Sequence, residues 1–145
     1  MDYILNIETA TEDCSVALSA DGVLVQELMA EEKLSHATSL QPLTDNLFES
    51  QSIKLTDLSA VAASMGPGSY TGLRIGLSTA KGIAYALNIP LIGITTLRTA
   101  AIGAAKTLKV KQGDVLMPVI DARRMEVYAM LFDFEIKELQ KASSI

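Results

Sequence analysis

Residues 66–82 read GPGSYTGLRIGLSTAKG, a glycine-rich turn that leads directly into a helical pattern of small and apolar residues. A glycine inside a helix costs roughly 1 kcal/mol relative to alanine, and Gly76 and Gly82 both fall within the helical pattern. The close approach of another backbone or of a ligand would recover that cost. The stretch therefore predicts a sharp turn followed by a tightly packed helix.

The segments on either side of this stretch predict further strands and helices. Three strand patterns separated by polar turns predict an antiparallel meander at residues 3–8, 14–19 and 23–28. Apolar residues spaced three and four apart predict a helix in the pattern that runs from Ser35 to about residue 50. The helix either begins near Thr38, which places Pro42 in its first turns, or is kinked at Pro42. The other patterns predict a small-residue strand, a helix, a short strand and a last helix at residues 59–65, 72–87, 89–94 and about 95–106.

The pattern changes at Gly113, where a second hairpin begins that resembles the first meander, with strands at 115–121 and 126–132. Residues 133–145 are too few to supply this hairpin with helices. The preceding order, βββαβαβα, gives an α/β fold with a mixed sheet and helices on its faces, as in the ribonuclease H-like domain that actin-like (ASKHA) proteins contain twice. The sequence predicts one such domain at residues 1–112 and the start of a second, incomplete one at 113–145, as in a shortened chain.

Composition excludes several classes of protein. With 145 residues, 49% of them hydrophobic, and a mean hydropathy of +0.29, the chain is expected to fold around one ordinary core. It has neither the roughly 18 consecutive apolar residues of a membrane span nor a basic segment before the first strand, so we expect a cytoplasmic protein. Cys14 and His36 are the only residues of their kinds, which argues against disulfides and metal sites. The net charge of −5 indicates that any contact with RNA runs through a more basic partner.

The glycine turn has the spacing of neither standard nucleotide-binding motif. A P-loop needs a second glycine five residues after its first, but Thr71 and Leu73 stand five residues after Gly66 and Gly68. The dinucleotide pattern likewise meets Thr71 where its third glycine belongs. Anion binding at the free N–H groups of the helix N-terminus stays open.

The helix after the turn has too little polar surface to be covered on one side only. Arg74, Ser78, Lys81 and Tyr85 share one narrow strip, which holds the only charges of the helix. Small residues recur at spacing four, at positions 72, 76, 80 and 84. One side is expected to pack on the sheet, and another on a helix of the same chain or on a second protein. The candidate partner interface consists of Leu40, Leu43, Leu47, Gly72, Ile75, Gly76, Thr79, Ala80, Ile83 and Ala84.

Four segments together resemble the bacterial TsaB family, also called YeaZ. They are ILNIETA at residues 4–10, GPGSYTGLRIG at 66–76, TTL at 95–97 and VIDARRMEVY at 119–128. The resemblance covers nearly the whole chain and implies a role in forming N6-threonylcarbamoyladenosine in tRNA. It also implies a non-catalytic partner of the TsaD-type transferase, working with a TsaE-type ATPase and meeting tRNA only through the complex. In the family, the two helices corresponding to about 36–50 and 70–87 pair with those of TsaD, or with a second copy in a homodimer.

The resemblance also bears on catalysis. It implies that the catalytic paralogue holds a metal through two histidines, whereas the corresponding segment here, residues 94–99, reads ITTLRT. We therefore expect no catalytic residue and no metal, and the chain lacks the His-Glu-x-x-His motif of a peptidase. The alternative is an actin-like ATPase or small-molecule kinase. Its candidate residues are Glu8, Thr9 and Thr11, in a glycine-free first loop that would bind ATP or ADP only at a composite site with a partner.

Overall fold

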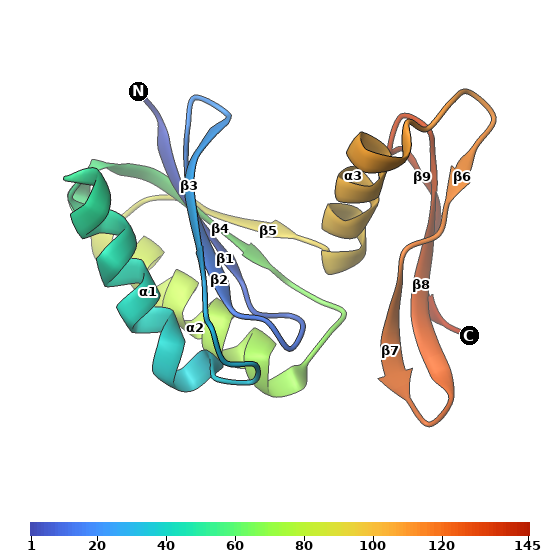
Figure 1. The fold of residues 1–145 in the computed structure, drawn as a ribbon, viewed down its shortest axis with the longest axis horizontal. Coiled ribbons are helices and arrows are strands. Elements are labelled where there is room, and N and C mark those ends of the chain that lie inside the picture. Colours follow the sequence, from blue (N-terminus) through green and yellow to red (C-terminus); the bar gives the residue numbers. More distant parts are fainter. The chain divides into compact units, whose positions relative to one another are not determined.

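The computed structural model describes residues 1–145, which form two compact units (Figure 1). Unit 1 comprises residues 1–65 and 69–93, and unit 2 comprises residues 66–68 and 94–145. Each unit has its own sheet and its own apolar core.

The sheet of unit 1 has five strands in the order β3-β2-β1-β4-β5. The strands are β1 (Tyr3–Glu8), β2 (Ser15–Ala20), β3 (Val23–Met29), β4 (Leu58–Ser64) and β5 (Leu91–Ile94). The first three form the predicted antiparallel meander, and β4 runs parallel to β1. β4 is buried along nearly its whole length, as its small, apolar sequence predicts for a central strand.

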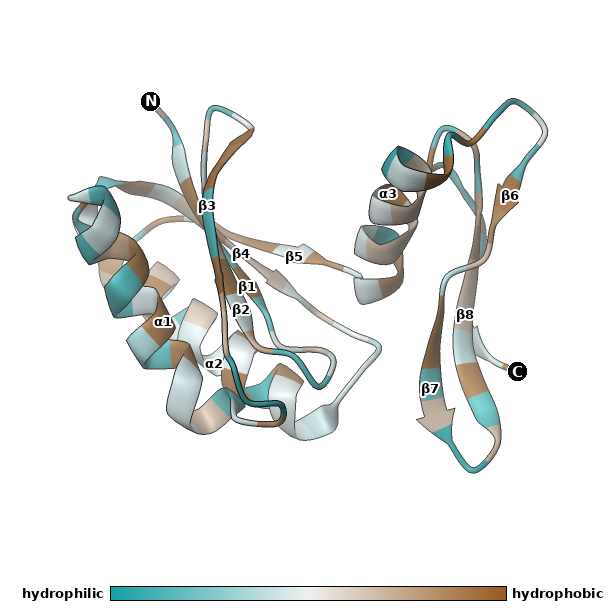
Figure 2. Ribbon diagram, viewed as in Figure 1, coloured by the Kyte–Doolittle hydropathy of each residue, from teal (hydrophilic) through white to brown (hydrophobic).

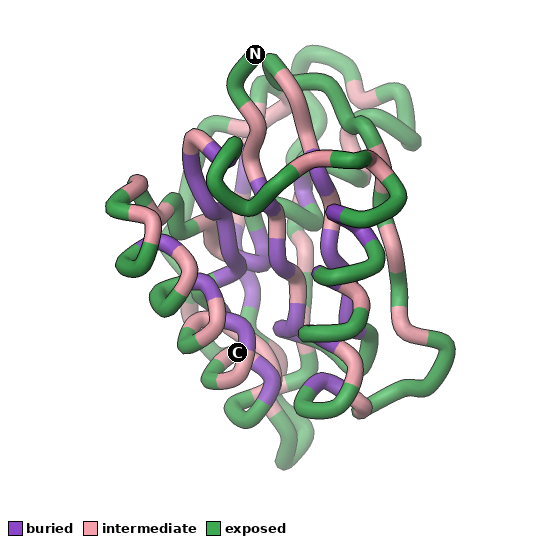
Figure 3. Tube along the Cα trace, turned by 90° about the vertical axis from the view of Figure 1, so that its left-hand side faces the viewer, coloured by how far each residue is buried: buried purple, intermediate pink, exposed green.

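Two helices, α1 (His36–Gln51) and α2 (Tyr70–Leu87), pack against each other and against this sheet (Figure 1). α1 begins directly after Ser35, where the helical pattern starts, rather than near Thr38, and it continues through Pro42. A short 3-10 helix, η1 (Leu55–Asp57), connects α1 to β4. Apolar and polar bands alternate along α1 in Figure 2, and buried residues recur about once per turn of the helices in Figure 3. One face of each helix therefore meets the core, which includes Leu5, Val16, Leu18, Leu47 and Val61.

Unit 2 contains α3 (Thr96–Leu108) and an antiparallel sheet. Its strands are β6 (Val115–Leu116), β7 (Val119–Arg123), β8 (Glu126–Asp133) and β9 (Glu138–Ser144). β8 pairs with β6 and β7 along one edge and with β9 along the other. The predicted hairpin is therefore present, and β9, which the sequence analysis did not predict, extends it to a three-strand meander like that of unit 1.

The helix α3 packs with unit 2. Its Leu97 and Ala101 share a buried cluster with Met130 and Phe132 of β8. The chain passes from unit 1 to unit 2 at residue 94. The predicted domain boundary lies after residue 112, and this boundary between two actin-like domains stays a prediction. None of the helices is long and apolar enough to cross a membrane.

Candidate functional site

The glycine turn fixes α2 against the loop between β1 and β2. The backbone N–H of Ser69 donates to the Ala10 carbonyl at 2.6 Å, and the Ser69 hydroxyl accepts from Gly72 N–H at 3.2 Å. Ser69 is thus the N-cap of α2 and satisfies one of the free N–H groups of its first turn. This loop therefore receives the N-terminus of the helix.

Two glycines of α2 allow the backbones to approach closely. A methyl group at Gly72 would overlap the carbonyl oxygen of Thr9, and one at Gly76 would overlap the Thr9 hydroxyl. Gly82, by contrast, has open space around its Cα. The close approach of Thr9, through its backbone at Gly72 and through its side chain at Gly76, therefore accounts for these two glycines.

The three candidate nucleotide-binding residues hold this loop together. The Glu8 carboxylate accepts hydrogen bonds from the Ala10 N–H at 2.7 Å and from the Ser64 hydroxyl. Thr9 is buried against α2, and the Thr11 hydroxyl accepts from the Asp13 N–H at 3.3 Å. These contacts stabilise the loop between β1 and β2.

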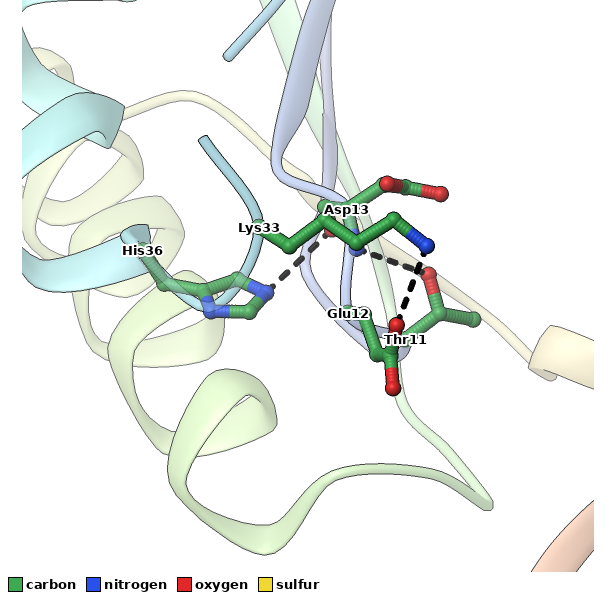
Figure 4. A network of polar contacts seen from close by, with 5 residues as sticks. All are labelled: Thr11, Glu12, Asp13, Lys33 and His36. Atoms are coloured by element: carbon green, nitrogen blue, oxygen red, sulfur yellow. Dashed lines mark hydrogen bonds and ion pairs between the residues drawn. The ribbon is translucent and has the colours of Figure 1, made fainter. Parts of the chain in front are cut away.

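The same loop is tied to the start of α1 (Figure 4). The Nε2 of His36 lies 3.2 Å from the carbonyl oxygen of Asp13 and donates to it, since a carbonyl only accepts. The Lys33 ammonium pairs with Glu12 at 3.1 Å, and this is the only ion pair of the chain. The hydrogen bond that Lys33 donates to Glu12, together with the negative charge of Glu12, raises the pKa of the exposed Lys33 side chain. The sole histidine therefore has a structural contact, which a sequence reading did not reveal.

The structure corrects the predicted partner interface. Six of its residues, Leu40, Leu47, Gly72, Gly76, Ala80 and Ala84, are buried within unit 1. The row of small residues on α2 thus faces its own sheet and loop, where short side chains let the helix lie close. These six residues offer no free surface to a partner.

The other four predicted interface residues, Leu43, Ile75, Thr79 and Ile83, are half-buried. They flank an outward face on which α1 exposes Gln41, Asp45 and Glu49 and α2 exposes Tyr70, Arg74, Ser78, Lys81 and Tyr85. The Arg74 guanidinium lies 4.4 Å from the centre of the Tyr70 ring. We call these eight exposed residues the outer helix face. The sequence analysis identified the charged strip on α2 but not the acidic pair on α1, Asp45 and Glu49. The spacing of four residues between these two carboxylates could have indicated that they share one face of the helix.

Comparisons with known proteins place the chain in a family. A family model described as TsaD, tRNA N6-adenosine threonylcarbamoyltransferase, matches residues 26–144. The chain is 42% identical over 128 residues to the tRNA threonylcarbamoyladenosine biosynthesis protein TsaB of Escherichia coli, and 31% identical over 132 residues to that of Bacillus subtilis. The chain belongs to the TsaD family and, within it, to the TsaB (YeaZ) group.

The alignments cover most of this TsaB-type chain but only part of its relatives. The alignment with the Escherichia coli protein includes 86% of this chain and 52% of that protein. The alignment with the Bacillus subtilis protein includes 91% of this chain and 56% of that protein. The chain thus spans about half the length of the curated relatives it matches.

Solved structures agree with this assignment. YeaZ from Pseudomonas aeruginosa matches the whole chain and 67% of its own length, with a TM-score of 0.86 and 29% identity. The ethanolamine utilization protein EutJ from Carboxydothermus hydrogenoformans matches with a TM-score of 0.59 at 12% identity, which shows a common fold alone. The actin-like, ribonuclease H-like fold predicted from the sequence is confirmed.

Proposed function

We propose that the chain is a non-catalytic subunit in tRNA threonylcarbamoyladenosine biosynthesis and that it binds the TsaD-type transferase through the outer helix face. The names of its TsaB relatives support the pathway. The composition of the outer helix face supports the docking role. The chain would act in the cytoplasm, as a component of a tRNA-modifying complex that includes a TsaE-type ATPase.

The observation that carries the proposal is the outer helix face itself. It presents two exposed tyrosines, of which Tyr85 is 90% exposed and Tyr70 is 70% exposed. All eight residues of the outer helix face are exposed. Aromatic and arginine side chains are enriched at protein interfaces, so Tyr70, Arg74 and Tyr85 suit a docking surface.

A non-catalytic role agrees with the chemistry of the described residues. The segment that would correspond to the metal-binding histidines of the transferase begins α3 with Thr96, Leu97 and Arg98. The polar groups of the first loop, Glu8 and Thr11, bond within the loop and to β4. The chain has a net charge of −5, which favours contact with tRNA through the partner rather than directly.

A binding experiment with a matched control tests this proposal. Ser78 lies at the centre of the exposed strip of α2, so Ser78→Trp should obstruct docking, whereas Ala100→Trp places the same side chain on the exposed surface of α3. We expect the full chain to bind a purified TsaD-type transferase in surface plasmon resonance. Ser78→Trp should weaken binding at least about tenfold, and Ala100→Trp should bind like the unmodified chain.

Reconstituted modification of tRNA by the transferase supplies a second readout. Addition of the chain should increase threonylcarbamoylation, and Ser78→Trp should reduce that increase. Absence of binding, or equal binding by the two variants, would contradict the proposed docking role.

A further inference from the structure

We infer that the free edge of β3 binds an extended, basic segment of another protein, which adds to the sheet of unit 1 as a further antiparallel strand. The segment carries apolar residues at alternate positions and lysine or arginine between them. This inference goes beyond the proposed function and does not depend on it, because β3 and the outer helix face consist of different residues.

β3 is an edge strand of its sheet, with β2 on one side and no strand on the other. Exposed edges usually carry proline or charged residues, lysine above all, because their free N–H and C=O groups can pair with another strand. The other edge strands are short or basic: β5 and β6 have four and two residues, β7 ends at Arg123, and β9 contains Lys141. β3 has seven residues and contains neither a proline nor a basic residue. Its edge is therefore the one least protected against an added strand.

The pairing of β3 with β2 shows which backbone groups are free. The Ala30 N–H donates to the Cys14 carbonyl at 2.9 Å, in register with the antiparallel pairs of the two strands. In such a pair, every second residue directs both its N–H and its C=O to the partner strand, so Leu28 also faces β2. Glu27 and Met29 consequently direct their backbone groups away from β2, to the open edge.

The first half of β3 exposes apolar side chains. Val23, Leu24 and Val25 are all exposed, and Leu24 has 60% of its surface in solvent. A shift of register between Leu18 and Ser19 leaves Val25 without a partner on β2. The shift does not extend to residues 26–29, which stay in regular register. An added strand could therefore pair with the regular half and cover apolar surface beside the other half.

Acidic residues select a basic occupant. Glu27 is exposed in the regular half of β3, and Asp21, Glu31 and Glu32 are exposed beyond its two ends. The only ion pair of the chain uses none of these four carboxylates. A basic residue opposite Glu27 would form a cross-strand pair of opposite charge. Antiparallel pairing with β3 of a second copy would instead bring Asp21 of each chain towards Glu31 and Glu32 of the other, so charge complementarity favours a different, basic strand.

The pairing geometry fixes which positions of the added strand are basic. Residues directly opposite each other in an antiparallel pair lie on the same face of the sheet. Those opposite Glu27 and Met29 would exchange backbone hydrogen bonds with β3 and would lie on the same face as the Glu27 carboxylate. The residues between them would lie on the other face, with Leu28, which packs against the core. Basic residues therefore suit the hydrogen-bonding positions, and apolar residues suit the positions between them.

Fluorescence anisotropy of labelled peptides with the full chain tests the inference. The peptide KVTVKVTVK has the expected pattern, and EVTVEVTVE carries the opposite charge. In low salt we expect saturable binding of the first peptide and binding of the second that is at least about tenfold weaker. N-methylation of the lysine and threonine amides blocks the N–H groups directed to β3 and should weaken binding at least about tenfold. N-methylation of the valine amides should change binding by less than about threefold, because those N–H groups point away from β3.

Variants of the chain and amide exchange locate the bound peptide. Glu27→Lys should weaken binding of KVTVKVTVK at least about fivefold. Glu135→Lys, the same change of charge at an exposed residue of unit 2, is the control and should have no effect. Bound peptide should slow hydrogen exchange of the Glu27 and Met29 amides, measured by NMR, and should leave the Leu28 amide unchanged because it already faces β2.

Several outcomes would overturn the inference. They are absence of binding by KVTVKVTVK, equal weakening by the two patterns of N-methylation, equal binding by Glu27→Lys and Glu135→Lys, and slowed exchange in α1 and α2 instead of β3. The docking variant Ser78→Trp should bind the peptide like the unmodified chain. A chain that binds the TsaD-type transferase but not the peptide would overturn this inference alone, and one that binds only the peptide would overturn the proposed function alone.

Discussion

Single residues of α2 set how closely the helix approaches the first loop. Gly72 and Gly76 face Thr9, where a Cβ atom has no room, while Gly82 lies on the exposed side of the same helix. The three glycines look alike in the sequence. Their environments make them different, so substitutions by alanine should have opposite effects.

We expect Gly76→Ala to destabilise the chain by about 1–3 kcal/mol, because the added methyl group displaces the Thr9 side chain. Gly82→Ala is the matched control and should stabilise the chain by up to about 1 kcal/mol through helix propensity alone. Urea unfolding followed by circular dichroism measures both changes in the free energy of unfolding. Equal effects from the two substitutions would show that Gly76 does not lie against the loop.

The single cysteine lies in the core. Cys14 is fully buried, and burial raises the pKa of its thiol, which lowers the fraction of reactive thiolate at neutral pH. We expect iodoacetamide to leave Cys14 unmodified in the native chain and to alkylate it fully in concentrated urea, as measured by intact mass. Rapid alkylation under native conditions would contradict its placement in the core.

At the level of elements, the turn between β7 and β8 carries a strained backbone. Three consecutive residues, Arg123, Arg124 and Met125, have left-handed φ angles of 67°, 55° and 67°. Such a conformation costs roughly 1–2 kcal/mol for a residue with a Cβ atom. The Asp121 carboxylate partly compensates by accepting the Arg123 N–H at 2.7 Å.

Arg124→Gly should therefore stabilise the chain by about 0.5–1 kcal/mol, since relief of the strain exceeds the added entropy of the unfolded glycine. The neighbouring Glu126→Gly should instead destabilise it, because Glu126 belongs to β8 and has no positive φ. Thermal unfolding of the two variants measures the difference. Destabilisation by Arg124→Gly would indicate that the arginine side chain makes a contact worth more than the strain.

At the scale of the molecule, the two units differ in the size of their cores. The buried cluster of unit 1 draws on two helices and the strands β1, β2 and β4, whereas that of unit 2 consists of Leu97, Ala101, Met130 and Phe132. Opening free energies follow the amount of buried apolar contact. Unit 2 should accordingly open more readily than unit 1.

Hydrogen exchange measured by mass spectrometry should show faster exchange in β7 and β8 than in β1 and β4. The helix α3 should exchange together with β8 and be protected less than α2, because its buried residues pack with β8. Protection of α3 equal to that of β1 and β4 would favour the boundary at residue 113 over the change of unit at residue 94.

The sequence by itself determined the order of strands and helices through residue 108, because alternating and helical apolar patterns are local. Its motifs also determined the family. Only the tertiary structure decided which face of α2 is internal, since a row of small residues suits a sheet, a loop or a second helix equally well. The residue that settles this, Thr9, lies more than sixty positions upstream of Gly72. The proposed docking surface therefore consists of exposed tyrosines and charged residues on the side of α2 opposite to its small residues.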